Sequence, residues 1–286
     1  IMGQYEIDAV LHFAASSQVG ESMVDPGKYY YNNVAGTLGL LDAMRESGVE
    51  YIVFSSTAAV YGEPDQVPIT EDMPLHPTNS YGRTKLMIEN MLRDYSMAYG
   101  LHYVALRYFN AAGASLLGNI GEDHNPETIS FPRHPAALGK RDAISIFGTD
   151  YDTPDGTCLR DYIHVKDLAS AHILALNHLV KGGASRVYNL GTKTGLSVRE
   201  IINAVKEVTG RDFMVKEEKR RAGDPARLIA SSEKLQRNSI GSPNTAASRK
   251  LWRRHGAGIA ATPMDIAEPY GYPGNRRSSR QKLWRS

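Results

Sequence analysis

The 286-residue chain has little of several features that mark particular protein classes. It contains one cysteine, Cys158, which excludes an internal disulfide framework. No apolar run approaches the roughly 18 residues of a membrane span. The first residues lack the basic and apolar regions of a signal peptide. We therefore expect a soluble, cytoplasmic protein with no membrane partner, in which Cys158 is a small buried residue rather than a nucleophile.

Several catalytic signatures are also missing. The nine histidines form no H-x-x-x-H or H-E-x-x-H pair and there is no cysteine pair, so no metal site is predicted. Neither a G-x-S-x-G nucleophile elbow nor a Walker loop occurs. The glycine-rich turn that normally opens a dinucleotide-binding fold is absent as well. The chemistry must therefore come from other side chains.

Tyr81 and Lys85 are the most informative residues that are present. Four positions apart in a predicted helix, they share one helix face. A tyrosine normally titrates near pH 10, but a nearby cation favours the phenolate, so this pair can be a general acid/base. Thr57 follows a predicted strand over 51–55, and ligands bind beyond the carboxyl ends of such strands. We expect Thr57 to relay a proton; a strand-capping hydroxyl is the structural alternative.

The hydrophobic pattern alternates between strands and helices. The predicted strands are 9–14, 51–55, 103–107, 186–190 and 213–215. The predicted helices are 26–48, 81–99, 165–179 and 197–209, the last with a capping box of Ser197 and Glu200. The β-α-β-α-β order of the first half predicts a parallel, doubly wound sheet.

Five segments narrow this interpretation. They read SSTAAVYG at 55–62, RYFNAAG at 107–113, FGTDY at 147–151, DGT at 155–157 and RDYIHV at 160–165. From about Asp8 to Leu235 the chain resembles the UDP-glucose 4-epimerase family of the extended short-chain dehydrogenase/reductase superfamily. The resemblance implies an α/β fold, with a Rossmann-like sheet and a smaller α/β domain that closes over the sugar nucleotide.

The resemblance also implies an NAD cofactor, a UDP-sugar substrate and a set of site residues. The implied catalytic residues are Thr57, Tyr81 and Lys85. The implied cofactor-binding residues are Phe13, Ala14, Ala15, Ser17, Asn32, Tyr81, Lys85, Tyr108 and Phe109. The implied substrate-binding residues are Thr57, Asn110, Arg160, Arg221 and Asp224, with the arginines and Asn110 at the diphosphate and Asp224 at a uridine ribose hydroxyl.

The family interconverts UDP-glucose and UDP-galactose by transient oxidation at C4 of the sugar. By resemblance, Tyr81 takes the proton of the 4-hydroxyl through Thr57 while the hydride passes to the nicotinamide. The keto sugar then rotates about its link to the diphosphate and is reduced on its other face. An N-acetylhexosamine or glucuronate epimerase stays open, because the sequence does not give the pocket size. A 4,6-dehydratase is disfavoured, because Ala58 and Ala59 stand where it typically needs Asp-Glu.

The resemblance has gaps. The first predicted strand corresponds to the family's fourth, so we expect an incomplete sheet that lacks the glycine loop, with weak NAD binding and little activity. The expected domains are a remnant of the NAD-binding domain over 1–110 and mainly a substrate domain over 111–235, with 165–191 returning to the large sheet.

Residues 236–286 form an atypical tail with ten Lys and Arg against two Asp and Glu. This tail and residues 129–135 depart from the family, and we interpret both as out-of-frame or divergent sequence. A non-catalytic fragment whose basic tail binds nucleic acid without specificity is the alternative of another class. No specific nucleic-acid partner is predicted, and the resemblance allows a homodimer through 33–44 and 87–95.

Overall fold

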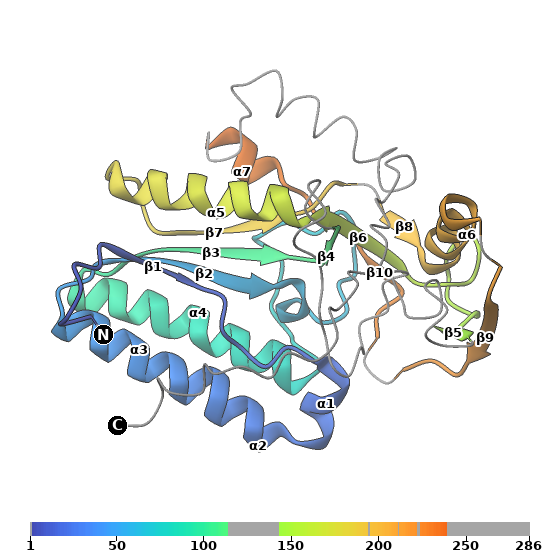
Figure 1. Ribbon diagram of the computed structural model, residues 1–286, viewed down its shortest axis with the longest axis horizontal. Coiled ribbons are helices and arrows are strands. Elements are labelled where there is room, and N and C mark those ends of the chain that lie inside the picture. Colours follow the sequence, from blue (N-terminus) through green and yellow to red (C-terminus); the bar gives the residue numbers. More distant parts are fainter. Residues whose placement is uncertain (1, 114–142, 194, 211, 222–223, 239–286) are drawn as a thin grey trace, which may run out of the picture.

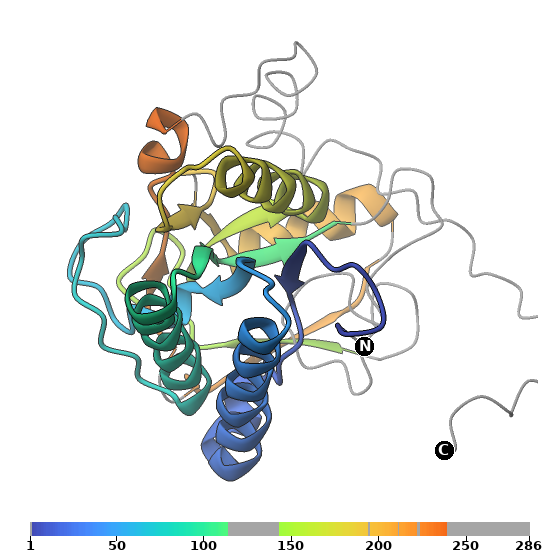
Figure 2. The same ribbon diagram turned by 90° about the vertical axis from the view of Figure 1, so that its left-hand side faces the viewer.

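The computed structural model describes residues 2–113, 143–193, 195–210, 212–221 and 224–238. Its large sheet has four parallel strands. In spatial order they are β1 (Ala9–His12), β2 (Tyr51–Thr57), β3 (His102–Tyr108) and β7 (Arg186–Leu190). Helices cover both faces, with α3 (Gly36–Glu46) and α4 (Ser80–Tyr99) on one side and α5 (Val165–Val180) on the other (Figures 1 and 2). The predicted parallel, doubly wound α/β fold is thus confirmed.

Alternation along the strands explains this layered arrangement. Ile52 and Phe54 of β2 pack toward α3 and α4, whereas Val53 packs toward α5. Successive side chains of a strand point to opposite faces, so a strand buried on both sides reads as a continuous apolar run. The two hydrophobic cores therefore lie back to back across one sheet. β7 pairs with β3, so the 186–190 segment lies in this sheet.

The helix expected over 26–48 is interrupted. It begins as predicted with α2 (Pro26–Tyr29), because the Asp25 side chain accepts the Lys28 N–H at 3.2 Å and proline fits the first turn. A π-helical segment, Tyr30–Ala35, then precedes α3. The wider turn places Asn33 inside, where it is 1% exposed. The short helix α1 (Val19–Val24) connects this unit to β1.

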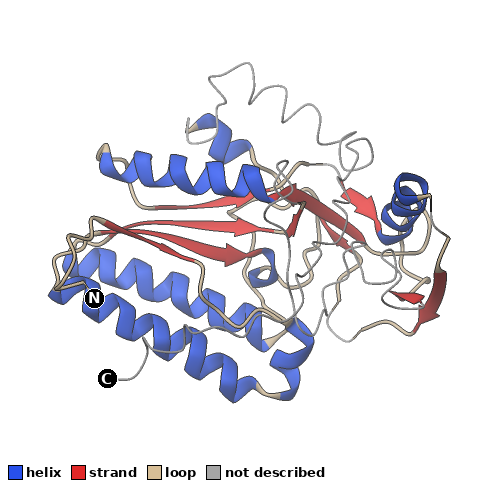
Figure 3. Ribbon diagram, in the orientation of Figure 1, coloured by secondary structure: helices blue, strands red, loops and turns tan. Residues whose placement is uncertain are grey.

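A second group of strands lies beyond the carboxyl ends of the large sheet (Figure 3). The small sheet contains β10 (Arg227–Leu228), β6 (Leu159–His164) and β4 (Asn110–Ala112), with β8 (Gly195–Ser197) antiparallel to β6. A separate pair comprises β5 (Ala143–Phe147) and β9 (Met214–Glu218). Among these strands only the one expected near 213–215 was predicted, and it is observed as β9.

Helix α6 (Val198–Thr209) covers this second region, and its predicted capping box is present. Ser197 accepts the Glu200 N–H at 2.9 Å, and the Glu200 side chain accepts the Ser197 N–H at 2.7 Å. The last described helix, α7 (Glu233–Arg237), returns to the large sheet and places Leu235 in the core under α5. Within the described ranges no helix is both long and apolar enough to span a membrane. Residues 129–135 and 239–286 lie outside the described residues.

Candidate active site

The N-terminus of α4 meets the carboxyl end of β2, which brings the predicted catalytic residues together. Thr57 ends β2, and Tyr81 and Lys85 lie in the first two turns of α4. The contact between these elements needs glycine at position 82, since a Cβ there would lie 2.5 Å from the Ala59 carbonyl oxygen. The helix can therefore approach the strand end closely enough for its side chains to meet Thr57.

The hydroxyl of Thr57 has two neighbours. Its Oγ1 accepts the Ala59 N–H at 3.2 Å and so caps the short 3₁₀ helix Ala58–Val60. The same hydroxyl also lies near enough to the phenol of Tyr81 to favour its ionised form. A hydroxyl has one donor and two acceptor sites, so the cap leaves Thr57 able to relay a proton.

Lys85 is a buried cation at the centre of this cluster. It is 3% exposed, and its Nζ donates to the Ser55 carbonyl oxygen at 2.8 Å. The ammonium also lies 4.8 Å from the centroid of the Phe54 ring. Burial lowers the pKa of Lys85 to about 8, although the nearby Glu89 carboxylate acts in the opposite direction. At neutral pH the amine is therefore mostly charged, although keeping the charge buried costs free energy.

The pKa of Tyr81 departs from the expectation based on its spacing from Lys85. Burial, followed by the nearby Tyr108, raises the pKa of the phenol, and the nearby Thr57 hydroxyl only partly opposes this. The predicted lowering by Lys85 is therefore wrong for this structure. The reason is geometric: the ammonium donates to the Ser55 carbonyl and lies 5.9 Å from the Tyr81 ring centroid. Helical spacing fixes a shared face but not where a long side chain ends.

A buried amide connects the predicted cofactor turn to the catalytic helix. Asn33 accepts the Ser16 N–H at 2.8 Å and donates to the Ser16 carbonyl at 3.0 Å and to Thr84 Oγ1 at 3.1 Å. The turn formed by residues 13–17, which contains the predicted Phe13, Ala14, Ala15 and Ser17, is thereby held beside α4. The predicted Asn32 is exposed and donates to Asn33 Oδ1 at 3.0 Å. The role of Asn33 was not predicted, because its only signal in the sequence is the Asn-Asn pair.

The adjacent predicted residues Tyr108 and Phe109 face different surroundings. The Ser55 hydroxyl lies near the phenol of Tyr108, whose ring centroid is 6.3 Å from that of His172. Phe109 packs in the cluster of Val60, Tyr61 and Ile69. Tyr108 is the β3 partner of Thr57 in the sheet register, so this residue lies at the strand end that carries Thr57.

The predicted substrate residues lie on the small sheet and next to it. Arg160 of β6 pairs with Asp224, with 2.5 Å between Nη2 and Oδ1, so these two predicted ligands contact each other. The guanidinium of Arg221 lies 3.7 Å from the centroid of the Phe147 ring. Asn110 donates from Nδ2 to the Asp161 carbonyl at 3.3 Å. The arrangement gathers two guanidinium groups and a carboxylate on one side of the second region.

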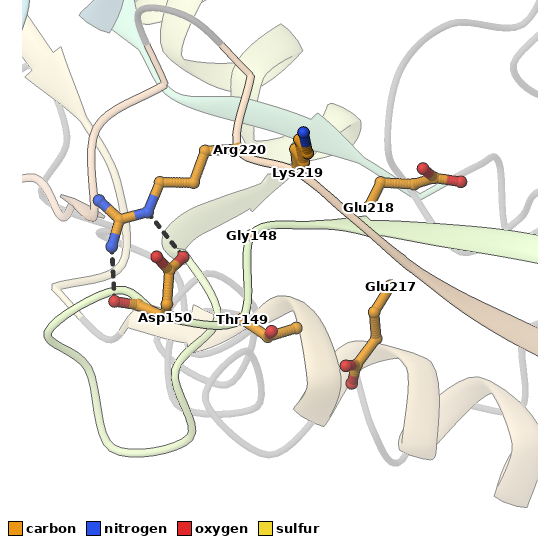
Figure 4. Close-up of a pocket in the computed structure, with 7 residues that line it drawn as sticks. All are labelled: Gly148, Thr149, Asp150, Glu217, Glu218, Lys219 and Arg220. Carbon is orange, nitrogen blue, oxygen red and sulfur yellow. Dashed lines mark hydrogen bonds and ion pairs between the residues drawn. The ribbon is translucent and has the colours of Figure 1, made fainter.

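A pocket of about 420 Å³ lies between residues 148–150, which follow β5, and residues 217–220 at the end of β9 (Figure 4). Its wall includes Gly148, Asp150 and Arg220, and the guanidinium of Arg220 donates to Asp150 Oδ1 at 2.7 Å. Arg220 also lies 4.1 Å from the centroid of the Tyr151 ring. The pocket therefore adjoins the FGTDY segment and the basic residues before Asp224, and neither Thr57 nor Tyr81 is among the residues that line it.

Comparison with known proteins identifies the family. The model of the NAD dependent epimerase/dehydratase family matches residues 1–191. This chain belongs to that family. The UDP-glucose 4-epimerase of Halalkalibacterium halodurans is 56% identical over 237 residues, which cover 82% of this chain and 71% of that protein. The UDP-glucose 4-epimerase of Streptococcus mutans is 54% identical over 232 residues, covering 81% and 70%.

Solved structures of the epimerase/dehydratase family agree. A UDP-glucose 4-epimerase from Brucella ovis in complex with NAD matches with a TM-score of 0.81 and 52% identity over 84% of this chain and 74% of that one. The enzyme from Bifidobacterium longum in complex with NAD+ and UDP matches with a TM-score of 0.79 and 39% identity over 90% and 79%. The predicted resemblance is therefore confirmed.

This epimerase/dehydratase family member also contains a buried ionic network that the sequence analysis missed. Glu89 of α4 accepts Arg107 Nε at 2.9 Å and Nη2 at 2.6 Å, and it accepts the Ser56 hydroxyl at 2.5 Å. Arg107 also donates from Nη1 to the Tyr61 hydroxyl at 2.8 Å, and Tyr61 donates to Asn189 Oδ1 at 2.7 Å. The network joins α4, β2, β3 and β7, and its member in β2 is Ser56, the residue before Thr57.

Proposed function

We propose that this chain catalyses the NAD-dependent interconversion of UDP-glucose and UDP-galactose. The observation that carries the proposal is the placement of Tyr81 near Thr57 at the carboxyl end of β2, in a chain 56% and 54% identical, over 237 and 232 residues, to two UDP-glucose 4-epimerases. Two neighbouring hydroxyls beside a buried lysine suit proton transfer to and from a sugar hydroxyl. The reaction would be an oxidation and re-reduction at C4.

The groups present at this end fit the nicotinamide half of NAD. The Lys85 ammonium has three N–H donors, of which the Ser55 carbonyl takes one, so the others suit the ribose hydroxyls. The turn formed by residues 13–17 is held beside α4 through Asn33. Phe13, which is 55% exposed, and Tyr108 would flank the nicotinamide. When bound, NAD supplies the hydride acceptor and donor.

In this proposal Tyr81 holds and releases the proton of the sugar 4-hydroxyl, with Thr57 between them. Because burial raises the pKa of Tyr81, the phenol is ready to donate a proton at neutral pH. Accepting one requires stabilisation of the phenolate, and Lys85, in the next turn of the same helix, is the cation available for that task. The lysine thus supplies charge while Tyr81 carries the proton.

Arg160 and Arg221 would anchor the diphosphate, with Asp224 at the uridine ribose and Asn110 at the diphosphate. A guanidinium has five N–H donors, and Arg160 uses one for the Leu159 carbonyl and one for Asp224. Donors therefore remain for phosphate oxygens without breaking the ion pair. Anchoring the nucleotide while leaving the sugar loose permits both faces of the keto sugar to react.

Turnover of UDP-galactose by the purified chain with NAD tests the proposal, and Tyr81→Phe tests its mechanism. We expect Tyr81→Phe to lower kcat by about 10²- to 10⁴-fold, because the proton carrier is lost. KM should change little, because the anchoring groups are untouched. Tyr99→Phe, on an exposed position of the same helix, is the matched control and should behave as wild type.

A Tyr81→Phe variant that retains most of the rate would show that another residue carries the proton. The turnover rate in the same assay tests the low activity expected from the sequence. Its dependence on NAD concentration tests the expected weak NAD binding. Running it with UDP-N-acetylglucosamine tests substrate breadth, since a solved relative described as a UDP-Glc/GlcNAc 4-epimerase from Campylobacter jejuni is 45% identical.

The homodimer stays a proposal as well. Leu38 on α3 and Met87 on α4 are each 43% exposed, which supports a contact through these two helices. The cytoplasmic location stays an expectation.

A further inference from the structure

Asp161 of β6 is a fully buried carboxylate to which the proposed mechanism gives no role. It is 0% exposed, and its two oxygens accept four hydrogen bonds. Oδ1 accepts the Thr192 N–H at 2.8 Å and the Thr192 hydroxyl at 2.7 Å. Oδ2 accepts the Lys193 N–H at 3.2 Å and the Ala230 N–H at 3.1 Å. Within the described residues no ion pair involves Asp161, so neutral donors alone offset the cost of burying it.

These donors belong to the places where the chain passes between the two sheets. Thr192 and Lys193 lie in the link from β7 of the large sheet to β8 of the small sheet. Ala230 lies in the link from β10 back to α7, which packs on the large sheet. The backbone carbonyl of Asp161 also accepts from Asn110, which begins β4 directly after β3. Three crossings between the sheets therefore meet at one residue.

The chain is folded tightly around the carboxylate. A Cβ at Gly191 would lie 2.4 Å from Asp161 Oδ2 and 2.4 Å from the Cβ of Ala230, so no side chain fits there. Lys193 has a φ of +66°, a left-handed conformation that costs a lysine free energy. Such a conformation persists only where its surroundings hold it, and the hydrogen bond to Asp161 does so here.

The junction lies between the two halves of the proposed site. Arg160, the residue before Asp161, pairs with Asp224 on the proposed nucleotide side. Asn110 follows Tyr108, whose partner in β2 is Thr57, by two residues. The distance between the sugar-reacting groups and the nucleotide-anchoring groups therefore depends on how the two sheets are held at Asp161.

We propose that Asp161 is a positioning residue whose carboxylate joins two of the crossings and whose backbone carbonyl joins the third, and that it so sets the spacing between Thr57 and Tyr81 on one side and Arg160 on the other. This inference rests on the proposed function for its effect on turnover. The claim that Asp161 holds the crossings together does not rest on the proposed function, because hydrogen exchange at the junction can be measured in a chain without activity.

The test is Asp161→Asn in the full chain. The amide keeps the size but offers one acceptor oxygen, and its NH2 group faces N–H donors. We expect kcat per folded molecule to fall by about 10- to 100-fold, because small misplacements of reacting groups have effects of that order. Binding of UDP alone, measured by calorimetry, should stay within about threefold of wild type, because UDP needs only the nucleotide side.

Asp155→Asn is the matched control. Among the described residues Asp155 also accepts only neutral donors, from Thr157 and Ser197, but all of them lie within the second region. This variant should lose stability and keep kcat. Equal losses of kcat in both variants, or wild-type kcat in Asp161→Asn, would overturn the proposal.

Hydrogen exchange separates this proposal from the proposed function. Peptides that cover 191–193 and 229–231 should exchange faster in Asp161→Asn than in wild type, whether or not the chain turns over UDP-galactose. Unchanged exchange there overturns the junction, whereas an inactive wild-type chain overturns only the function. If Asp161→Asn does not fold, Thr192→Val removes one of the four donors, and unchanged exchange in that variant overturns the proposal equally.

Discussion

Two buried carboxylates hold different parts of this molecule together in different ways. Glu89, 5% exposed, is paired with Arg107 through two hydrogen bonds. Asp161, 0% exposed, accepts three backbone N–H groups and one hydroxyl. Glu89 joins regular elements of the large sheet, whereas Asp161 joins the links that pass between the sheets.

The difference follows from what each segment can offer. Side chains on α4 and β3 project toward each other across a packed interface, so a glutamate and an arginine can meet there. A tight chain crossing presents mainly its own backbone N–H groups. Mutation can replace an ion pair by apolar side chains, but no substitution other than proline removes a backbone N–H donor. Apolar side chains should therefore be able to replace the Glu89–Arg107 pair, whereas they should not be able to replace the Asp161 carboxylate.

The largest effect is expected when only one member of the ion pair is removed. Arg107→Met leaves the Glu89 carboxylate buried without its cation, and the free energy of unfolding should fall by about 3–5 kcal/mol. Urea denaturation at pH 7 measures this. Arg199→Met is the control, because its ion pair with Glu217 is exposed and should contribute less than about 1 kcal/mol.

The double variant Glu89→Leu, Arg107→Met sharpens the comparison. Replacing both charges by apolar groups of similar size should recover much of the lost stability. If the double variant is no more stable than Arg107→Met, the network is not exchangeable and the contrast with Asp161 fails.

The predictability of the elements depended on how continuous their apolar pattern was. The helix Ser80–Tyr99 and the strand Arg186–Leu190 were anticipated almost to the residue, because each has a clear period and a defined end such as Gly100, with a φ of +76°. Strand β6 was missed because it buries Arg160 and Asp161 among its apolar residues. A pattern-based prediction treats such polar residues as exposed.

The site was predictable only where function fixes spacing along the chain. Tyr81 and Lys85 could be named because a helix turn brings them together. Asn33 and Asp161 could not, because their roles depend on partners as far apart in sequence as Thr84, 51 positions away, and Ala230, 69 positions away. The pKa of Tyr81 was predicted in the wrong direction because burial of the phenol raises it, and the Lys85 ammonium donates to the Ser55 carbonyl instead of the phenol.

Lys85 extends the comparison to a buried cation without a carboxylate hydrogen-bonded to it among the described residues. Its pKa is lowered from 10.5 to about 8. Between these values the unfolded chain binds more protons than the folded chain, so stability rises with pH across that range. Relative to Lys85→Met, wild type should gain about 3 kcal/mol in free energy of unfolding between pH 7 and pH 10.

Urea denaturation of both proteins at pH 7, 8.5 and 10 measures this difference, and other titrating groups cancel in it. Tyr99→Phe serves as a control whose difference from wild type should not vary between pH 7 and 8.5. A pH-independent difference for Lys85→Met would mean that the ammonium stays charged throughout, at no cost, as an ion-paired group would.

The smallest effect is expected at a partly exposed polar cluster that neither crosses between the sheets nor contains an ion pair. Ser197 caps α6 through the Glu200 N–H and donates to Asp155 at 2.5 Å. Ser197→Ala should lower the free energy of unfolding by about 1 kcal/mol, the usual cost of losing a cap. Ser170→Ala is the control, because that exposed hydroxyl only bonds the Lys166 carbonyl within α5, and its loss should change little. A loss above about 3 kcal/mol for Ser197→Ala would place this cluster with the buried carboxylates, and the distinction drawn from chain crossings would no longer hold.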